Sequence, residues 1–268
     1  MTISEICGKY KLKPPLKWAG GKRWLLPHLL PLWEKQNSRR LVEPFSGGLS
    51  VSLGLMPGDA LINDYNKHLI NYFNQVKQGL VVNLAMVNEE KLYYKYRNTF
   101  NGLLKDGKAL TTEAAQLFYY LNRTGYNGLC RFNKKGYFNV PFGRYKKINY
   151  ISDFRIYMEV FKNWSFWSSD FEELIVSESD FIYADPPYDV QFTQYADREF
   201  KWADQVRLAN WLAVHKGPVI LSNQATDRIV DLYNNLGFHL TYLDAPRRIS
   251  CTGDRTPAKE VLAIRNCN

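Results

Sequence analysis

The alternation of short apolar runs and helical stretches near the N-terminus constrains the fold most. The run 39–45 predicts a strand, and a glycine turn at 46–48 leads into a small-residue helix. A second apolar run, 60–64, ends in an acid, and a helical pattern follows over 67–77. Parallel sheets bind nucleotides with this order of strand, glycine turn, helix and acid-ended strand. We therefore expect an α/β fold with a doubly wound sheet.

The alternation stops in the middle of the chain and then resumes. Helical patterns cover 89–104 and 111–121, and an irregular segment rich in Gly, Asn and aromatic residues extends from 122 to about 150. The later elements that we expect are strands at 165–168, 180–184, 218–222, 238–243 and 260–264, and helices at 203–215 and 227–235. The sequence therefore predicts a core that is interrupted by an inserted, mainly helical or irregular module.

The inserted module is basic and aromatic. The formal net charge of +9 points to a polyanionic partner, unless it only aids solubility. From 114 to 152 there is no Asp or Glu, whereas seven Lys and Arg residues are interleaved with aromatic ones. A solvated surface normally mixes both signs of charge, so this segment is better suited to phosphates and bases.

The cysteines and histidines argue against a metal site. The four cysteines are scattered without a Cys-x-x-Cys pair, and the four histidines lack metal-ligand spacing. The first thirteen residues hold no apolar core of signal-peptide length, and no run approaches the length of a membrane span. We therefore expect a soluble intracellular protein with reduced thiols, no metal and no membrane partner.

Two glycine-containing segments fit a pocket that is lined by backbone. The turn Glu43-Pro44-Phe45-Ser46-Gly47-Gly48 lets a ligand approach closely because glycine has no Cβ, and it lacks the G-x-G-x-x-G pattern of NAD sites. The segment Lys17-Trp18-Ala19-Gly20-Gly21-Lys22 suggests a pocket for an anionic group but lacks the spacing of a P-loop. Each segment taken alone also fits an ordinary tight turn or a solvated loop.

One short motif carries the strongest chemical signal. Asp185-Pro186-Pro187-Tyr188 directly follows the apolar run 181–184, and two prolines end a strand because neither has an N–H. Open α/β sheets place their ligands at such strand ends. A carboxylate, a carbonyl and an aromatic face together can hold an exocyclic amine on a flat ring. The alternative is a strand-ending turn with a core tyrosine.

Two further acids follow predicted strands. Asp64 is placed to hydrogen-bond a ribose diol, or alternatively to cap the helix that follows. Asp170 and Phe171 could offer an acceptor and an aromatic edge to an adenine ring. The alternative for this pair, which the two residues alone favour, is a helix N-cap with a core phenylalanine.

Taken together, these residues resemble the Dam-type (α-group) DNA adenine-N6 methyltransferases, in their GATC-recognising branch. The resemblance covers nearly the whole chain, with the motifs in the order typical of the family. The matching segments are 17–22, 43–48, 63–64, 126–131, 139–145, 170–171 and 185–188. The resemblance implies a Rossmann-like methyltransferase core formed by 1–65 and 151–268, and a target-recognition domain over 66–150.

The resemblance also implies roles for individual residues. Those that would hold S-adenosylmethionine are Trp18, Lys22, Phe45, Gly47, Gly48, Asp64 at the ribose, and Asp170 and Phe171 at the adenine. Those that would carry catalysis are Asp185, Pro186 and Tyr188. Those that would contact DNA are Lys17 at the first base, Arg131 at the last pair, Tyr126 as a wedge, Asn127, Leu129 and Tyr145 at central bases, and Arg144 at a phosphate.

The implied reaction is methyl transfer to a flipped-out adenine of GATC in duplex DNA, in the cytoplasm of a bacterial or phage-infected cell. We expect a monomer in solution, with more than one copy able to bind one DNA. Hydrogen bonds from the N6 amine to Asp185 and to the Pro186 carbonyl would localise the nitrogen lone pair, and Tyr188 would stack on the ring.

The chain departs from the family pattern at three places, and two other functions remain as alternatives. Glu43 stands where many methyltransferases carry Asp, and Ser46-Gly47-Gly48-Leu49 stands where others have G-x-G. The stretch 189–198 looks shorter than in some relatives. A methyltransferase for RNA or for a protein glutamine is one rival, and the basic insert argues against a protein substrate. An inactive DNA-binding regulator is the other, and the intact Asp64, Asp185 and Tyr188 argue against it.

Overall fold

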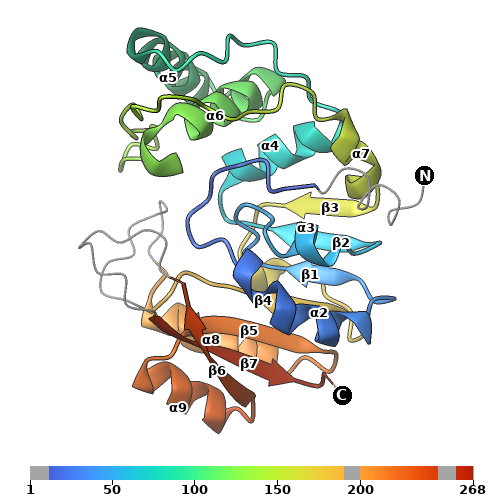
Figure 1. The fold of residues 1–268 in the computed structure, drawn as a ribbon. Coiled ribbons are helices and arrows are strands. Elements are labelled where there is room, and N and C mark those ends of the chain that lie inside the picture. Colours follow the sequence, from blue (N-terminus) through green and yellow to red (C-terminus); the bar gives the residue numbers. More distant parts are fainter. Residues whose placement is uncertain (1–11, 190–199, 247–257, 268) are drawn as a thin grey trace.

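The computed structural model describes residues 12–189, 200–246 and 258–267, which form a seven-stranded mixed sheet with helices on both faces (Figure 1). The strand order is β3-β2-β1-β4-β5-β7-β6. The strands are β1 (Leu41–Glu43), β2 (Ala60–Asn63), β3 (Trp164–Trp167), β4 (Phe181–Ala184), β5 (Val219–Gln224), β6 (His239–Ala245) and β7 (Ala258–Arg265). The pairs among β1 to β5 are parallel, and β7 is antiparallel to β5 and β6. The expected α/β fold with a doubly wound, Rossmann-like mixed sheet is confirmed.

The carboxyl ends of β1, β2 and β4 lie side by side. Leu41 of β1 pairs with Ala60 of β2 and with Phe181 of β4, so the three strands end at one edge of the sheet. The chain leaves β1 toward β2 on one side and returns to β4 on the other. Such a switch point opens a crevice beyond the strand ends. The glycine turn, Asp64 and the motif 185–188 follow these three strands and therefore meet there.

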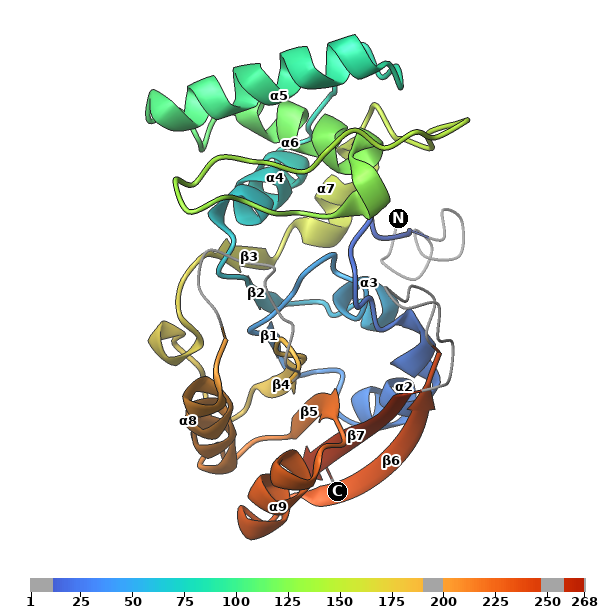
Figure 2. The same cartoon turned by 90° about the vertical axis from the view of Figure 1, so that its left-hand side faces the viewer.

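Alternating side chains of the strands face two hydrophobic clusters, one on each side of the sheet. On β4, Phe181 and Tyr183 belong to the first cluster, whereas Ile182 and Ala184 belong to the second. The helices that cover the first cluster are η1 (Arg23–Leu25), α2 (Leu26–Glu34) and α3 (Ser52–Leu55), and those that cover the second are α8 (Trp202–Ala213) and α9 (Asp227–Asn235) (Figure 2). Burial on both faces explains why the central strands are continuously apolar.

Four more helices stack beyond the β3 edge of the sheet (Figures 1 and 2). They are α4 (Lys67–Lys77), α5 (Glu90–Lys105), α6 (Thr112–Thr124) and α7 (Arg155–Phe161). α4 packs against α6, α7 and β3, and α5 packs against α6. Tyr72 stacks on Tyr119 with ring centres 5.6 Å apart, and Phe154 meets both rings edge-on. The first cluster therefore continues from the sheet into these helices, and the division at 65/66 and 150/151 stays a prediction.

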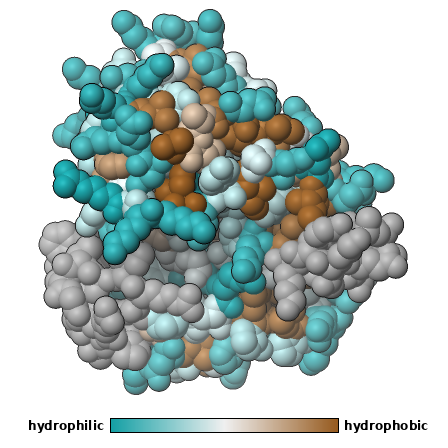
Figure 3. Space-filling view, turned by 45° about the horizontal axis from the view of Figure 1, so that its top comes forward, coloured by the Kyte–Doolittle hydropathy of each residue, from teal (hydrophilic) through white to brown (hydrophobic). Residues whose placement is uncertain are grey.

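The outer surface of this helical part mixes polar and apolar side chains. Figure 3 shows hydrophobic residues interspersed with hydrophilic ones over the upper part of the molecule, where α5 and α6 lie. The exposed large hydrophobic residues of this part are Val81, Val87, Leu110, Tyr126, Tyr150, Ile151 and Met158. Such a surface offers both charge for phosphates and flat apolar groups for bases.

Several predicted elements agree with the structure and others differ from it. α4 and α9 have the predicted bounds, and the predicted helix 111–121 continues to Thr124 as α6. The helix expected directly after the glycine turn begins only at Ser52. Gly47 and Leu49 have φ of 46° and 61°, which a right-handed helix cannot include.

The helical elements that were not expected from the sequence include η1, α2 and α7. α2 contains Pro27 at its start and Pro31 inside it. A proline is tolerated in the first turn of a helix but normally breaks its interior, so the pattern over 23–34 did not indicate a helix. α7 has only seven residues, which is too short for a clear period.

Candidate active site

A large cavity lies beyond the carboxyl ends of β1, β2 and β4, with a volume of about 1280 Å³. All eleven residues that were predicted to hold the cofactor or carry catalysis line it, together with Leu129 of the predicted DNA-contacting set. The loops after three strands thus bring together motifs that are far apart in the sequence. The predicted residues therefore lie around one cavity, and the contacts of each residue indicate what it can do there.

The glycine turn forms one wall of the cavity and is shaped to fit the Trp18 ring. A Cβ at Gly47 would come within 2.7 Å of Trp18 Nε1, and one at Gly48 within 2.8 Å of Trp18 Cβ. Gly47 also has φ of 46°, and the next positive φ in this turn belongs to Leu49. Backbone strain of this kind clusters at ligand sites. Only glycine allows the indole and the backbone to approach this closely.

Asp64 ties the glycine turn to the start of α4. Its carboxylate accepts the Gly47 N–H at 3.0 Å and the Asn66 N–H at 2.9 Å. Burial raises the pKa of Asp64, and these two hydrogen bonds act in the opposite direction. The residue that caps α4 is Asn66, whose side chain accepts from the His68 and Leu69 N–H groups. The alternative that Asp64 caps the helix is therefore wrong.

Asn66 also reaches the segment that follows α6. Its Nδ2 donates to Cys130 Sγ at 3.3 Å. Two residues further along, the His68 ring stacks on Phe132 with centres 4.8 Å apart. Burial lowers the pKa of His68 to about 4, so the ring is neutral at pH 7. The start of α4 therefore joins the cavity wall to the predicted DNA-contacting segment.

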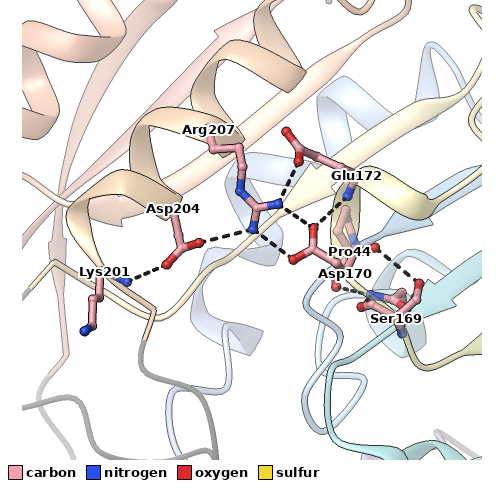
Figure 4. Close-up of polar contacts among 8 residues, drawn as sticks. Pro44, Ser169, Asp170, Glu172, Lys201, Asp204 and Arg207 are labelled. Carbon is pink, nitrogen blue, oxygen red and sulfur yellow. Dashed lines mark hydrogen bonds and ion pairs between the residues drawn. The ribbon is translucent and has the colours of Figure 1, made fainter.

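Asp170 is held by an arginine fork at the far side of the cavity (Figure 4). Arg207 donates to both oxygens of Asp170 at 2.8 Å, and also contacts Glu172 and Asp204. Asp170 accepts the Glu172 N–H and so caps the short helix η3 (Phe171–Glu173). Phe171 is buried, and the Arg207 guanidinium lies 4.4 Å from its ring centre. The capping alternative for this pair is thus present, although both residues also line the cavity.

The buried Asn63 joins the two loops that carry these motifs. Its Nδ2 donates to the carbonyls of Pro44 and Ser169 at 3.0 and 3.1 Å, and its Oδ1 accepts the Ser169 N–H. The loop at 43–48 and the loop at 168–171 are therefore held at a fixed separation across the cavity.

The turn 185–188 lies on the opposite side, where Asp185 is surrounded by polar groups. Asp185 Oδ1 accepts from Ser222 Oγ at 2.8 Å and lies 3.5 Å from Lys22 Nζ. The same ammonium lies 4.3 Å from the centre of the Tyr188 ring. Burial raises the pKa of Asp185, whereas Lys22 and Ser222 act to lower it. The Lys22 ammonium therefore contacts Asp185 and Tyr188 of this turn.

The turn itself is anchored from α8. Gln205 donates to the Pro187 carbonyl at 2.8 Å, and Asn223 donates to Gln205 Oε1 at 3.0 Å. Glu43, at the end of β1, is buried and accepts from the Ser52 hydroxyl. Burial raises the pKa of Glu43 to about 8, so this carboxyl is mostly protonated at pH 7.

The predicted DNA-contacting residues gather on one segment, and Lys17 is tied to it. The backbone of Lys17 pairs with the Asn122 side chain, its Nζ donates to the Arg123 carbonyl at 3.2 Å, and the ammonium lies 3.6 Å from the Tyr145 ring centre. Burial lowers the pKa of Lys17, with Arg123 acting in the same direction. The Lys17 ammonium thus already has contacts within the protein.

The rest of this set is more accessible. Tyr126 is 51% exposed, and Asn127 has φ of 52° within η2 (Tyr126–Gly128). Arg131 is exposed and donates to Asn139 Oδ1 at 2.8 Å, and Arg144 is exposed as well. These side chains therefore lie on a surface that a large partner can reach.

Comparison with known proteins identifies the family. The D12 class N6 adenine-specific DNA methyltransferases match this chain over residues 18–249. The chain belongs to this family. The retron Ec67 DNA adenine methylase of Escherichia coli is 34% identical to this D12-class methyltransferase over 266 residues, which cover 93% of this chain and 90% of that protein. The type II methyltransferase M1.LlaDCHI of Lactococcus lactis subsp. cremoris is 36% identical, covering 86% and 88%, and the DNA adenine methylase of Salmonella typhimurium is 34% identical, covering 93% and 94%.

This D12-class methyltransferase uses S-adenosylmethionine as methyl donor. The cavity, of about 1280 Å³, has room for a nucleoside-containing group, and any Cβ at Gly47 or Gly48 would displace Trp18 from its wall. Within the described ranges, no cluster of His, Cys, Asp or Glu could hold a metal ion. No helix in those ranges is long and apolar enough to cross a membrane.

The polar residues of this methyltransferase's site that were not predicted include Ser222, Arg207 and Glu260. Glu260 lies on β7, is 7% exposed, and has its Oε1 3.5 Å from Lys22 Nζ. The alternation along β7 places Glu260 on the same face as Leu262 and Ile264. An acid at a position that faces the core could therefore have indicated Glu260 as a site residue. The stretch after Tyr188 that looked short lies largely outside the described residues.

Proposed function

We propose that this enzyme transfers a methyl group from S-adenosylmethionine to N6 of a flipped-out adenine in duplex DNA, within GATC. The observation that carries the proposal is the single cavity that joins the glycine turn at Gly47 to the turn 185–188. Relatives that are named DNA adenine methylases support the reaction. The GATC assignment rests on the resemblance of segments 126–131 and 139–145 to the Dam-type family.

In the proposed cofactor site, the cradle of Trp18, Phe45, Gly47 and Gly48 holds the S-adenosylmethionine, and Asp64 accepts from its ribose. Burial and two existing N–H donors fix the Asp64 carboxylate in place. Asp170 and Phe171 form the adenine end, with the Asp170 carboxylate oriented by the Arg207 fork. Lys22 faces the same cavity from the catalytic side.

In the proposed mechanism, the bound sulfonium supplies an electrophilic methyl group. Asp185 and the Pro186 carbonyl accept hydrogen bonds from the two N–H groups of the N6 amine, which localises its lone pair for attack on the methyl carbon. As the N–CH3 bond forms, the S–CH3 bond would break to leave a neutral thioether, and one N6 proton would leave by way of the Asp185 carboxylate. Tyr188 stacks on the adenine and excludes water, while Gln205 holds the turn from α8. Orientation of this kind accounts for a large part of catalysis in transfers without a covalent enzyme intermediate.

The proposed DNA interface is the basic segment 122–150 on the helical part of the molecule. In this proposal 66–150 is the target-recognition domain of a core formed by 1–65 and 151–268. Tyr126 enters the base stack, which offsets the cost of extruding the adenine. Arg131 reads the last pair, Asn127, Leu129 and Tyr145 contact central bases, and Arg144 contacts a phosphate. Lys17 reaches the first base only after its bond to the Arg123 carbonyl breaks.

The proposed setting follows from the relatives, which come from bacteria and from a bacteriophage among other sources. We propose that the enzyme acts in the cytoplasm of a bacterial or phage-infected cell, as a monomer in solution that can load more than one copy onto a DNA. Type II relatives make a role in restriction–modification part of this proposal.

The decisive experiment measures labelled methyl transfer from S-adenosylmethionine to duplexes with one GATC and to matched duplexes with GTTC. We expect label on GATC alone. Label on both duplexes would retain the chemistry and reject the base assignments. Cofactor binding without label on either duplex would favour an RNA substrate, which single-stranded and structured RNA would test, or an inactive regulator.

Replacing Arg131 tests the proposed reading of the outer base pair. We expect Arg131→Ala to reduce discrimination at one outer pair of the site by roughly 1–3 kcal/mol, the range for a bidentate guanine contact. The measurement is the methylation rate on duplexes that vary at each position. The matched control is Lys134→Ala, an exposed cation in the same segment. Equal weakening on all sequences by both variants would mark Arg131 as a phosphate contact.

A further inference from the structure

Glu260 is a buried carboxylate that no proposed step has yet used. It pairs in register with Gln224, the last residue of β5, so it lies at the carboxyl end of the sheet where the cavity opens. Its neighbour on the same face of β7, Leu262, is buried in the same cluster as Tyr183. A carboxylate in such a place is retained at a cost in desolvation, which calls for a partner.

The partner of Glu260 is an ammonium that it shares with the catalytic motif. Lys22 Nζ lies 3.5 Å from Glu260 Oε1 and 3.5 Å from Asp185 Oδ1, and only 6% of the Lys22 side chain is exposed. A buried carboxylate and a half-buried one therefore compete for one cation. The equal distances mean that Lys22 can pair with either of them after a small movement.

This competition matters because Asp185 has a second task in the proposed reaction. Asp185 must accept a hydrogen bond from the target amine, and its Oδ1 already faces both Ser222 Oγ and Lys22 Nζ. A carboxylate that is fully paired with a cation is a poorer acceptor for a neutral amine. If Lys22 moved away without another carboxylate, a buried ammonium would be left unpaired, which is strongly unfavourable.

We propose that Glu260 is a positioning residue that takes over the Lys22 ammonium when the target adenine reaches Asp185. Glu260 thus acts through Lys22 and touches neither the base nor the cofactor. The inference rests on the proposed function, because it concerns how Asp185 becomes available to the amine.

A second observation places Glu260 next to the stacking residue. Glu260 Oε2 and the Tyr188 hydroxyl are both buried, and neither completes a hydrogen bond with the residues that the structure describes. The two groups nevertheless influence each other's pKa. Burial raises the pKa of Tyr188 well above its usual value, and Asp185 and Glu260 raise it further. A small shift of the Tyr188 ring onto a bound base would let its hydroxyl donate to Glu260.

The titratable groups around Asp185 and Glu260 determine how the pKa of Asp185 changes when the charge of Glu260 is removed. The groups that face them are Lys22, Glu43, Tyr183 and Tyr188. Burial raises the pKa of Glu260, with Asp185 acting in the same direction and Lys22 opposing. In Glu260→Gln, Asp185 loses a negative neighbour and gains sole use of Lys22. Both changes favour ionised Asp185, so the pKa of Asp185 must fall.

The test combines a kinetic and a spectroscopic measurement on Glu260→Gln. We expect the single-turnover rate constant of methyl transfer to fall roughly 10–100-fold, with the Kd for S-adenosylmethionine unchanged within about threefold. The acid limb of the rate profile should move to lower pH. Carboxyl NMR of Asp185 in the enzyme without DNA should show the same lowering of its pKa. Glu260→Asp should recover part of the rate.

The matched control is Glu178→Gln, which removes an exposed acid that pairs with Lys216 on the surface. It should match the wild type in every measurement. An unchanged rate constant or an unchanged Asp185 pKa in Glu260→Gln would overturn the inference, as would a parallel loss of folding stability and cofactor binding. Absence of methyl transfer by the wild type would instead reject the proposed function, and the Asp185 pKa would then still decide the inference.

Discussion

Asp185→Ala is expected to lower the rate of methyl transfer by roughly 10²–10⁴-fold, the range for a side chain that acts on a proton of the reacting group. The Kd for S-adenosylmethionine should stay within about threefold of the wild type, because the Gly47 cradle does not depend on the Asp185 carboxylate. Lys22 keeps Glu260 as a partner in this variant, so the buried ammonium is not left unpaired. Single-turnover transfer and calorimetric cofactor binding measure the two quantities.

The matched control for this variant is Asp231→Ala, which removes an exposed acid on α9. It should transfer methyl groups at the wild-type rate. If Asp185→Ala lost cofactor binding and activity together, Asp185 would belong to the cofactor site, and the role assigned to it in holding the target amine would be wrong.

Gly47→Ala is expected to weaken S-adenosylmethionine binding by about 100-fold, which corresponds to roughly 2.7 kcal/mol. Two effects lower the affinity. Gly47 has φ of 46°, and this left-handed conformation costs a residue with a Cβ roughly 1–2 kcal/mol, so an alanine favours a turn of another shape. The new Cβ would also come within 2.7 Å of Trp18 Nε1, so the indole must leave its place in the cradle.

Gly58→Ala serves as the control for the glycine substitution, because nothing lies within 4 Å of a Cβ there. Its cofactor affinity and melting temperature should equal those of the wild type. Calorimetry compares the affinities, and thermal unfolding shows whether Gly47→Ala remains folded. Wild-type affinity in a folded Gly47→Ala would show that the cofactor does not use this cradle.

The part of the site that could be predicted consists of short motifs. In each motif, the residues that shape the backbone lie next to the side chains that can bind or react. The two prolines after 181–184 mark a strand end, and Asp185 and Tyr188 lie within the same turn. The glycines at 47 and 48 likewise mark a close approach of backbone. In each case the fold needs only to bring the ends of neighbouring strands together, which a doubly wound sheet does.

The part that could not be predicted depends on pairs that are distant in the sequence. Arg207 and Asp170 are 37 residues apart, and so are Ser222 and Asp185. Lys17 was expected at a base, yet its ammonium contacts the Arg123 carbonyl 106 residues away. No local pattern reports such contacts, because they follow from tertiary packing rather than from period or turn chemistry.

The hydrophobic cluster that continues from the sheet into α4, α6 and α7 limits how the proposed target-recognition domain can be exchanged between such enzymes. A chimaera cut at 65/66 and 150/151 would divide this cluster, because α7 and Lys17 would come from one parent and their packing partners from the other. A graft that carries 12–17 together with 66–161 keeps these contacts within a single parent. New specificity is then transferred with its own supporting core, and the cofactor cradle remains intact.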